Sequence, residues 1–133
     1  MPSEGVPLLL RHRDFRLRLD PVSARSDALS RADATFVLRR GLADPECFSL
    51  ESVNYPGLFV RHRNFRILLT RPDGAADATF CTEQGGSAAA GGLLLRSVNF
   101  PDRRIAAHGD ELSLAAVPAS GAQLFRMTSP AAP

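Results

Sequence analysis

Hydrophobic and polar residues alternate in short runs along the 133-residue chain. Phe15, Leu17 and Leu19 alternate with arginines, and residues 65–69 repeat the arrangement. A period of two predicts strands with one buried face. Clusters of proline and glycine, such as the one at residues 72–74, separate these runs, and no long amphipathic helix is indicated. The pattern therefore predicts an all-β protein.

The chain also repeats itself at intervals of about 45 residues, a length typical of internally repeated folds. Three pairs of segments match: 10–19 with 60–69, 33–36 with 77–80, and 50–56 with 95–101. These matches predict one domain over residues 1–133 with three units, at about 6–46, 47–91 and 92–129, the first truncated at its start. About four strands per unit predict a β-trefoil rather than a propeller, which typically needs at least four blades.

Composition narrows the functional classes. Hydrophobic residues make up 44% and charged residues 23% of the chain, which is ordinary for a soluble globular domain. Because 16 basic residues, all arginine, are mixed with 14 acidic ones, no broad cationic face is indicated and nucleic acid is not expected as a partner. No apolar run is long enough to span a membrane and no signal peptide is recognised. We expect a monomer without a cofactor.

Two cysteines, Cys47 and Cys81, lie just before the leading strand of the second unit and in its closing strand. In a trefoil these positions can be neighbours, so we predict a disulfide; two buried thiols are the alternative. Closing a loop of about 35 residues would stabilise the fold by about 3 to 4 kcal/mol in the chain-entropy model. A disulfide would point to an oxidising compartment.

Three motifs carry a family resemblance. Ser-Val-Asn-Tyr-Pro-Gly at 52–57, Arg-His-Arg-Asn-Phe at 61–65 and Asp-Ala-Thr-Phe-Cys at 77–81 resemble the arabinose-binding domain of α-L-arabinofuranosidase B. The resemblance implies a non-catalytic β-trefoil module that binds terminal arabinofuranose side chains of plant polysaccharides such as arabinoxylan or arabinan. It also implies an attached or associated glycoside hydrolase and, if that enzyme is secreted, an extracellular location.

The resemblance further implies a pocket in each unit, formed by a histidine, an aspartate and an aromatic residue. In the second unit these are His62, Asp77 and Tyr55, joined by Asn54. The chemistry is reasonable, because a sugar offers hydroxyl groups to polar side chains and a weakly apolar face to an aromatic ring. We expect the second unit to bind sugar.

The other two units are expected to differ. His12 and Asp33 are present in the first unit, but no Asn-Tyr-Pro precedes them, so its aromatic wall is expected to be missing. The offset of 45 residues puts Ala107 and Ala122 where the second unit has its histidine and aspartate. His108 would face the other side of its strand. The third unit is therefore expected not to bind.

Structural roles remain open for each of these residues. The histidines could bond a turn backbone, the aspartates could cap a turn, and Tyr55 could be a core aromatic. The arginines beside the histidines are interpreted as solvated strand residues. Five phenylalanines are assigned to the core: Phe15, Phe36, Phe65, Phe80 and Phe125.

A metal site and a glycosidase site are both disfavoured. The histidines lie in separate units without a zinc-ligand spacing. A glycosidase usually needs two carboxylates across one sugar, whereas Asp33 and Asp77 belong to different units. The alternative to sugar binding is a degenerate trefoil that acts as a protein-interaction or structural module.

Overall fold

The computed structural model describes residues 8–84, 92–126, 128 and 130, and it confirms the all-β prediction. The expected truncated start of the first unit and the end of the second unit therefore lie largely outside the described residues. Ten strands, fewer than the dozen expected, form one antiparallel sheet within the described part. The elements are β1 (Leu8–Arg13), β2 (Arg16–Pro21), α1 (Ala28–Asp33), β3 (Phe36–Arg40), β4 (Phe48–Ser52), β5 (Phe59–Arg63), β6 (Arg66–Thr70), η1 (Ala75–Ala78), β7 (Phe80–Gln84), β8 (Leu93–Ser97), β9 (Arg104–His108), β10 (Glu111–Ala115) and η2 (Ala119–Gly121).

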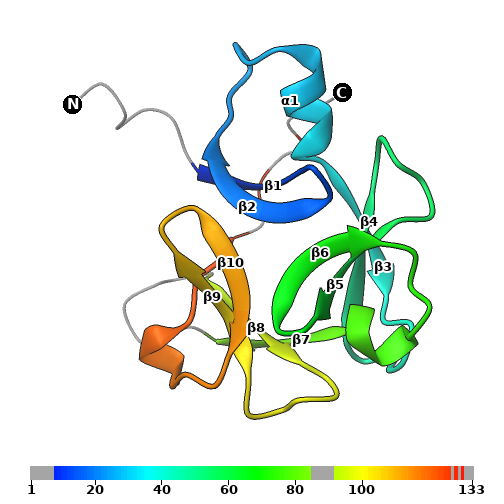
Figure 1. Ribbon diagram of the computed structural model, residues 1–133, viewed down its shortest axis with the longest axis vertical. Helices are drawn as coiled ribbons and strands as arrows, with labels where there is room; N and C mark the ends of the chain where they lie inside the picture. The colour runs from blue at the N-terminus through cyan, green and yellow to red at the C-terminus, as the bar shows by residue number, and fades with distance from the viewer. Residues whose placement is uncertain (1–7, 85–91, 127, 129, 131–133) are drawn as a thin grey trace.

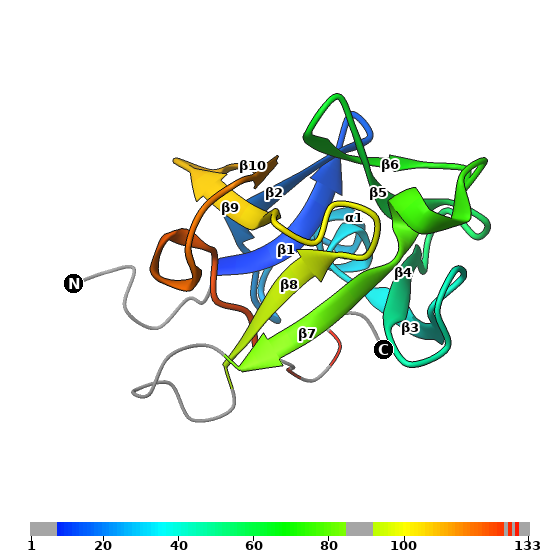
Figure 2. The ribbon, with the colours of Figure 1, turned by 90° about the horizontal axis from the view of Figure 1, so that it is seen from below.

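Strands that are consecutive in the chain pair as antiparallel hairpins: β1 with β2, β3 with β4, β5 with β6, β7 with β8 and β9 with β10. Further pairings connect these hairpins along the path β10-β6-β5-β4-β7-β8-β9, which returns to β10. The sheet therefore closes on itself (Figures 1 and 2). Among the described residues no helix is both long and apolar enough to cross a bilayer.

Three of the hairpins meet around a common centre, where β2, β6 and β10 pair with one another (Figure 1). Each contact between two of these strands uses corresponding backbone hydrogen bonds. The amides of Leu19, Leu69 and Leu114 donate to the carbonyls of Asp110, Phe15 and Phe65, respectively. This cyclic pattern holds the turn of each hairpin against the second strand of its neighbour.

The core lies inside this arrangement and is built from alternate strand positions. Its members include Leu17, Leu19, Ile67, Leu69, Leu112 and Leu114, each less than 9% exposed. Burying a side chain of this kind contributes about 1.5 to 3 kcal/mol. Phe80 is fully buried, and Phe36 and Phe125 pack against the core.

The assignment of Phe15 and Phe65 to the core is wrong, because these rings are 50% and 41% exposed. Each is the second residue of a two-residue turn, between β1 and β2 or between β5 and β6. Both turn residues have positive φ: 52° and 61° in the first turn, 51° and 61° in the second. Two-residue hairpins of type I′ require this conformation, which is uncommon for an aromatic residue.

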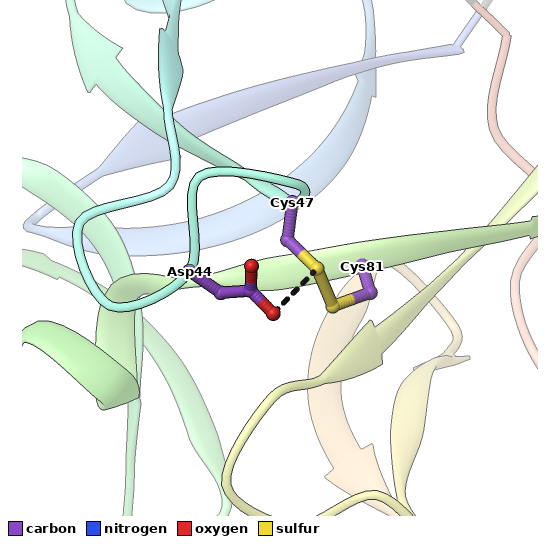
Figure 3. A group of neighbouring side chains, drawn as sticks. All are labelled: Asp44, Cys47 and Cys81. Carbon is purple, nitrogen blue, oxygen red and sulfur yellow. Dashed lines mark hydrogen bonds between the residues drawn. A yellow bond between two sulfur atoms is a disulfide. The ribbon is translucent and has the colours of Figure 1, made fainter.

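Cys47 and Cys81, the pair expected to be bonded, are joined by a disulfide with their Cα atoms 4.6 Å apart. Figure 3 shows Asp44 beside them, with its Oδ2 atom 3.7 Å from the Cys47 sulfur. Because a disulfide sulfur carries no hydrogen, this approach is a contact and not a hydrogen bond. The disulfide ties the turn before β4 to β7, and it consumes the two thiolates that a metal ion would need.

Candidate functional site

Two clusters of polar and aromatic side chains have nearly the same construction. The first cluster comprises His12, Asp33, Asn54, Tyr55 and Phe15. Its Asn54 lies between the other two polar groups: Oδ1 is 2.9 Å from His12 Nε2, and Nδ2 donates to Asp33 Oδ1 at 2.7 Å. His12 Nε2 is also 3.4 Å from that carboxylate oxygen. The result is a closed group of histidine, asparagine and aspartate.

The second cluster comprises His62, Asp77, Asn99, Phe100 and Phe65. Asn99 Oδ1 is 2.9 Å from His62 Nε2, and Asn99 Nδ2 donates to Asp77 Oδ1 at 2.8 Å. His62 Nε2 lies 3.5 Å from the same carboxylate oxygen. Corresponding distances in the two clusters therefore agree within 0.1 Å.

A buried serine supports the asparagine in each cluster. Ser52 Oγ donates to Asn54 Oδ1 at 2.9 Å and accepts from the amide of Tyr55 at 3.1 Å. Ser97 does the same for Asn99 and the amide of Phe100, at the same distances. Because the asparagine amide must face the carboxylate, its oxygen faces the histidine. The histidine therefore donates from Nε2, which defines the tautomer of the neutral ring.

Each carboxylate is also paired with the buried arginine before the histidine. This corrects the interpretation of Arg11 and Arg61 as solvated, whereas Arg13 and Arg63, after the histidines, are exposed as expected. Arg11 and Arg61 are only 5% and 3% exposed. Arg11 donates to Asp33 Oδ2 at 2.7 Å, and Arg61 donates to Asp77 Oδ2 at 2.6 Å. Burial of a guanidinium requires such partners. The aspartates are therefore held by side chains rather than acting as turn caps.

A second carboxylate completes the surroundings of each buried arginine. Arg11 also bonds Asp20, at 3.3 Å, and Arg61 bonds Asp73. The hydrogen bond from Arg61 lowers the pKa of Asp73. Each arginine therefore connects two carboxylates to the strand that carries the cluster's histidine.

The turn phenylalanines, which sequence reasoning assigned to the core, form part of an exposed aromatic wall. Tyr55 lies between His12 and Phe15, with ring centroids 5.3 and 5.6 Å away. Phe100 lies in the same way between His62 and Phe65, at 5.4 and 5.5 Å. The positive φ of the turn is what aims each phenylalanine outward; the Asp or Asn before it was the available signal.

The predicted grouping of Tyr55 and Asn54 with His62 and Asp77 is wrong. Both residues belong to the cluster of His12 and Asp33 instead. The reason is the strand pairing: β3, which follows Asp33, pairs with β4, and β4 leads into Asn54 and Tyr55. Each cluster thus combines a histidine and an aspartate of one unit with an asparagine and an aromatic residue of the next.

This pairing also corrects the expectation that the first cluster lacks an aromatic wall, because Tyr55 supplies it. Asn99 and Phe100 supply the second cluster, and sequence reasoning did not assign them to it. A detectable signal existed: Asp-Ala-Thr-Phe precedes a Ser-x-Asn segment in both places, and consecutive strands usually pair.

The third unit has no corresponding cluster in the described part of the chain. Ala107 pairs with Leu112 as His62 pairs with Ile67, so the alanine occupies the histidine's position. The preceding residue, Ala106, replaces the buried arginine. His108 is exposed at the end of β9, opposite Glu111 in the hairpin.

The two clusters differ in how far solvent reaches their carboxylates. The side chain of Asp33 is 8% exposed, whereas that of Asp77 is 30% exposed. Both histidines are buried, at 3% and 4%. The accessible groups are therefore the aromatic wall in both clusters and the carboxylate mainly in the second. Arg103 stacks over Phe65, 3.9 Å from the ring centroid, and adds a cation beside the second cluster.

Comparison with known proteins decides the family. Residues 7–129 match the family model described as the alpha-L-arabinofuranosidase B (ABFB) domain. The chain belongs to this domain family. The ABFB domain is 39% identical over 98 residues to a probable alpha-L-arabinofuranosidase B of Aspergillus clavatus, covering 71% of this chain and 19% of that protein. It is 34% identical over 108 residues to an alpha-L-arabinofuranosidase of Hypocrea jecorina, covering 78% and 21%.

Solved structures agree with this assignment. A crystal structure of an arabinofuranosidase complexed with arabinofuranosyl-alpha-1,2-xylobiose is 31% identical to the ABFB domain, with a TM-score of 0.73, covering 81% of this chain and 25% of that one. A β-trefoil called BEL is 17% identical with a TM-score of 0.52 over 97% of this chain and 89% of its own, which concerns the fold alone. The ABFB domain spans about a fifth of the length of the curated relatives that it matches.

Proposed function

We propose that this ABFB domain is a non-catalytic β-trefoil of three repeats that binds terminal arabinofuranose residues through its first and second clusters. The observation that carries the proposal is the construction of the two clusters, which repeat one set of side chains and distances. The family membership points to arabinofuranose-related carbohydrate. The meeting of β2, β6 and β10 and the likeness to a β-trefoil support the trefoil arrangement.

The chemistry of each cluster suits a single sugar ring. The exposed aromatic pair offers a flat apolar surface to the sugar's carbon-bound hydrogens. The ionised aspartate accepts hydrogen bonds from hydroxyl groups, and hydrogen bonds to charged groups contribute about 1.5 to 3 kcal/mol each before ordering costs. One furanose ring in one shallow site is then held weakly, with a Kd of about tens of micromolar to millimolar.

The histidine has a supporting role in this proposal. Because His62 is buried and its Nε2 is occupied by Asn99 and Asp77, it positions those two groups rather than meeting the sugar through that nitrogen. The arginine beneath does the same from the other side of the carboxylate. A rigid site loses less entropy on binding than one that must be ordered by its ligand.

We expect the second cluster to bind more tightly than the first, because its carboxylate is more exposed. The third position lacks the histidine, the arginine and the turn aromatic, so we expect no binding there. Two weak sites on one domain would add avidity on a branched polymer such as arabinoxylan or arabinan. The proposed role is to hold an attached or associated glycoside hydrolase on that polymer outside the cell, where the disulfide would persist.

Affinity electrophoresis in gels containing arabinoxylan, with unsubstituted xylan as the control, tests the proposal. We expect retardation by arabinoxylan only. The variants Asp33→Asn and Asp77→Asn keep side-chain volume and should each weaken binding, and together they should abolish it. His108→Ala, outside both clusters, is the matched control and should bind normally. A double variant that is retarded like the parent would overturn the proposal and favour the protein-interaction role.

A further inference from the structure

A hollow of about 530 Å³ lies between the β1–β2 and β5–β6 hairpins, apart from the hydrogen-bonded centres of both clusters. Its lining includes three arginines, Arg16, Arg63 and Arg66, together with Asp14, Asn64 and Phe15. No feature of the proposed arabinofuranose sites explains why arginines gather here. The strands beside the hollow, β2 and β6, pair directly at Arg16 and Leu68. Backbone pairing therefore fixes the positions of these two strands relative to each other.

The hollow carries more positive than negative charge. Within the described part of the chain, Arg16 and Arg66 have no ion pair or hydrogen-bonded partner for their side chains. Arg63 has only a long contact, 3.4 Å, with the exposed Asp73. Asp14 is the single acidic group in the lining. Three arginines and one aspartate therefore line the hollow, and a concave surface lined mainly by one sign of charge concentrates the opposite charge.

An adjoining depression of about 740 Å³ shares Arg16 and Arg66 and balances its remaining charges more closely. It adds Arg13 and Arg18, but Arg18 is already paired with Asp110, and Glu111 lines the same depression. Arg16 and Arg66, which have no side-chain partner among the described residues, therefore line both the hollow and the depression together with Asp14.

Phe15 links the hollow to the first cluster. Its ring lies 5.6 Å from that of Tyr55 and also lines the hollow. A saccharide chain with one residue on the aromatic wall would place a neighbouring residue near the arginines. The hollow is thus continuous with a proposed sugar site.

We propose that this hollow binds a carboxylate-bearing sugar, a uronic acid residue of the same polysaccharide. The inference rests on the proposed function, and it extends recognition from neutral arabinofuranose to an acidic neighbour. Arg16 and Arg66 hold the carboxylate, because the planar guanidinium matches carboxylate geometry with two parallel hydrogen bonds. Phe15 offers a face for the ring, and Asn64 and Asp14 bond its hydroxyl groups.

The test is affinity electrophoresis on glucuronoxylan without arabinose, compared with the same polymer after chemical reduction of its carboxyl groups. We expect retardation by the acidic polymer and little by the reduced one. The double variant Arg16→Gln/Arg66→Gln should bind the acidic polymer at least about tenfold more weakly, since each lost charged hydrogen bond is worth about that factor. The control Arg40→Gln/Arg71→Gln removes the same charge from exposed positions elsewhere and should change little.

Binding to neutral arabinan that keeps its arabinofuranose side chains separates this inference from the proposed function. The Arg16→Gln/Arg66→Gln variant should bind arabinan as the parent does, whereas Asp33→Asn/Asp77→Asn should not. Equal retardation by the acidic and the reduced polymer would overturn the inference, as would an unchanged double arginine variant. Tighter binding of heparin or DNA through the same arginines would also overturn it, because the hollow would then be a general polyanion surface. Thermal unfolding of each variant checks that the fold is retained.

Discussion

The two asparagines allow a matched test of how the clusters are stabilised. Asn54 and Asn99 make the same hydrogen bonds, to a histidine on one side and an aspartate on the other. We consider replacing each by alanine. The substitution removes the hydrogen bond to the aspartate, worth about 1.5 to 3 kcal/mol, and the bonds of the asparagine oxygen to the histidine and to the supporting serine, worth about 0.5 to 1.5 kcal/mol each.

The surroundings then separate the two variants. Asp33, the partner of Asn54, is 8% exposed, so water cannot readily replace the lost donor. Asp77, the partner of Asn99, is 30% exposed, so water can. We therefore expect Asn54→Ala to lower the free energy of unfolding by about 2.5 to 6 kcal/mol and Asn99→Ala by about half of that.

Urea unfolding at pH 7, with the disulfide intact, measures this difference as a shift of midpoint at constant slope. The expected order is parent, then Asn99→Ala, then Asn54→Ala. Serine variants of the same positions serve as controls for lost volume. Equal destabilisation by the two alanine variants, or the reverse order, would refute the reasoning that solvent access sets the cost of removing the bridge.

Further predictions concern the aromatic wall, the turn before β6, the disulfide and the loss of stability at acid pH. Tyr55→Ala should weaken sugar binding at the first cluster while leaving the second unchanged, by NMR titration with arabinose; an effect confined to the second cluster would contradict the assignment. Phe65→Asn should lower the conformational cost of the positive φ at this position, raise the free energy of unfolding by about 1 kcal/mol and weaken sugar binding; a lower melting temperature would count against this prediction. Reducing the Cys47–Cys81 bond should cost about 3 to 4 kcal/mol for a sequence separation of 34, measured by urea unfolding with and without reductant, and an unchanged midpoint would show that the bond adds nothing. Hydrogen bonds from Arg104 lower the pKa of Glu83, so the ionised pair stabilises the fold above the ordinary glutamate pKa of about 4.3, and this stabilisation is lost as the pH falls below it. Glu83→Gln should therefore reduce the dependence of the unfolding free energy on pH between about pH 5 and 3. A pH dependence parallel to that of the parent would disprove the contribution.

The all-β fold could be predicted because strand periodicity and repeats are local properties of sequence. Leu17, Leu19 and their counterparts Ile67 and Leu69 are buried as their alternation requires. Phe15 was misassigned because alternation assumes that the strand continues. A two-residue turn interrupts it, and an aromatic residue with positive φ is too uncommon to be expected.

The histidines and aspartates of the clusters could be proposed from their motifs, whereas their partners depend on which strands pair. Asn54 lies 42 residues from His12 in sequence and 2.9 Å from it in space. Motif matching within one repeat cannot find such a contact. The buried Arg11 was missed for a related reason: its partner Asp33 lies 22 residues away, and without that contact a strand arginine resembles a solvated one.

Because each cluster crosses a boundary between units, one unit does not contain a complete site. His62 and Asp77 need Asn99 and Phe100 from the following unit, as His12 and Asp33 need Asn54 and Tyr55. The segment carrying Asn99 therefore serves the second cluster even though its own unit has lost the histidine and the arginine. The segment around Asn99 and Phe100 keeps its contacts with His62 and Asp77 although Ala106 and Ala107 replace the arginine and the histidine. Under the proposed function, a repeat that has no cluster of its own would still be required for binding at the second cluster.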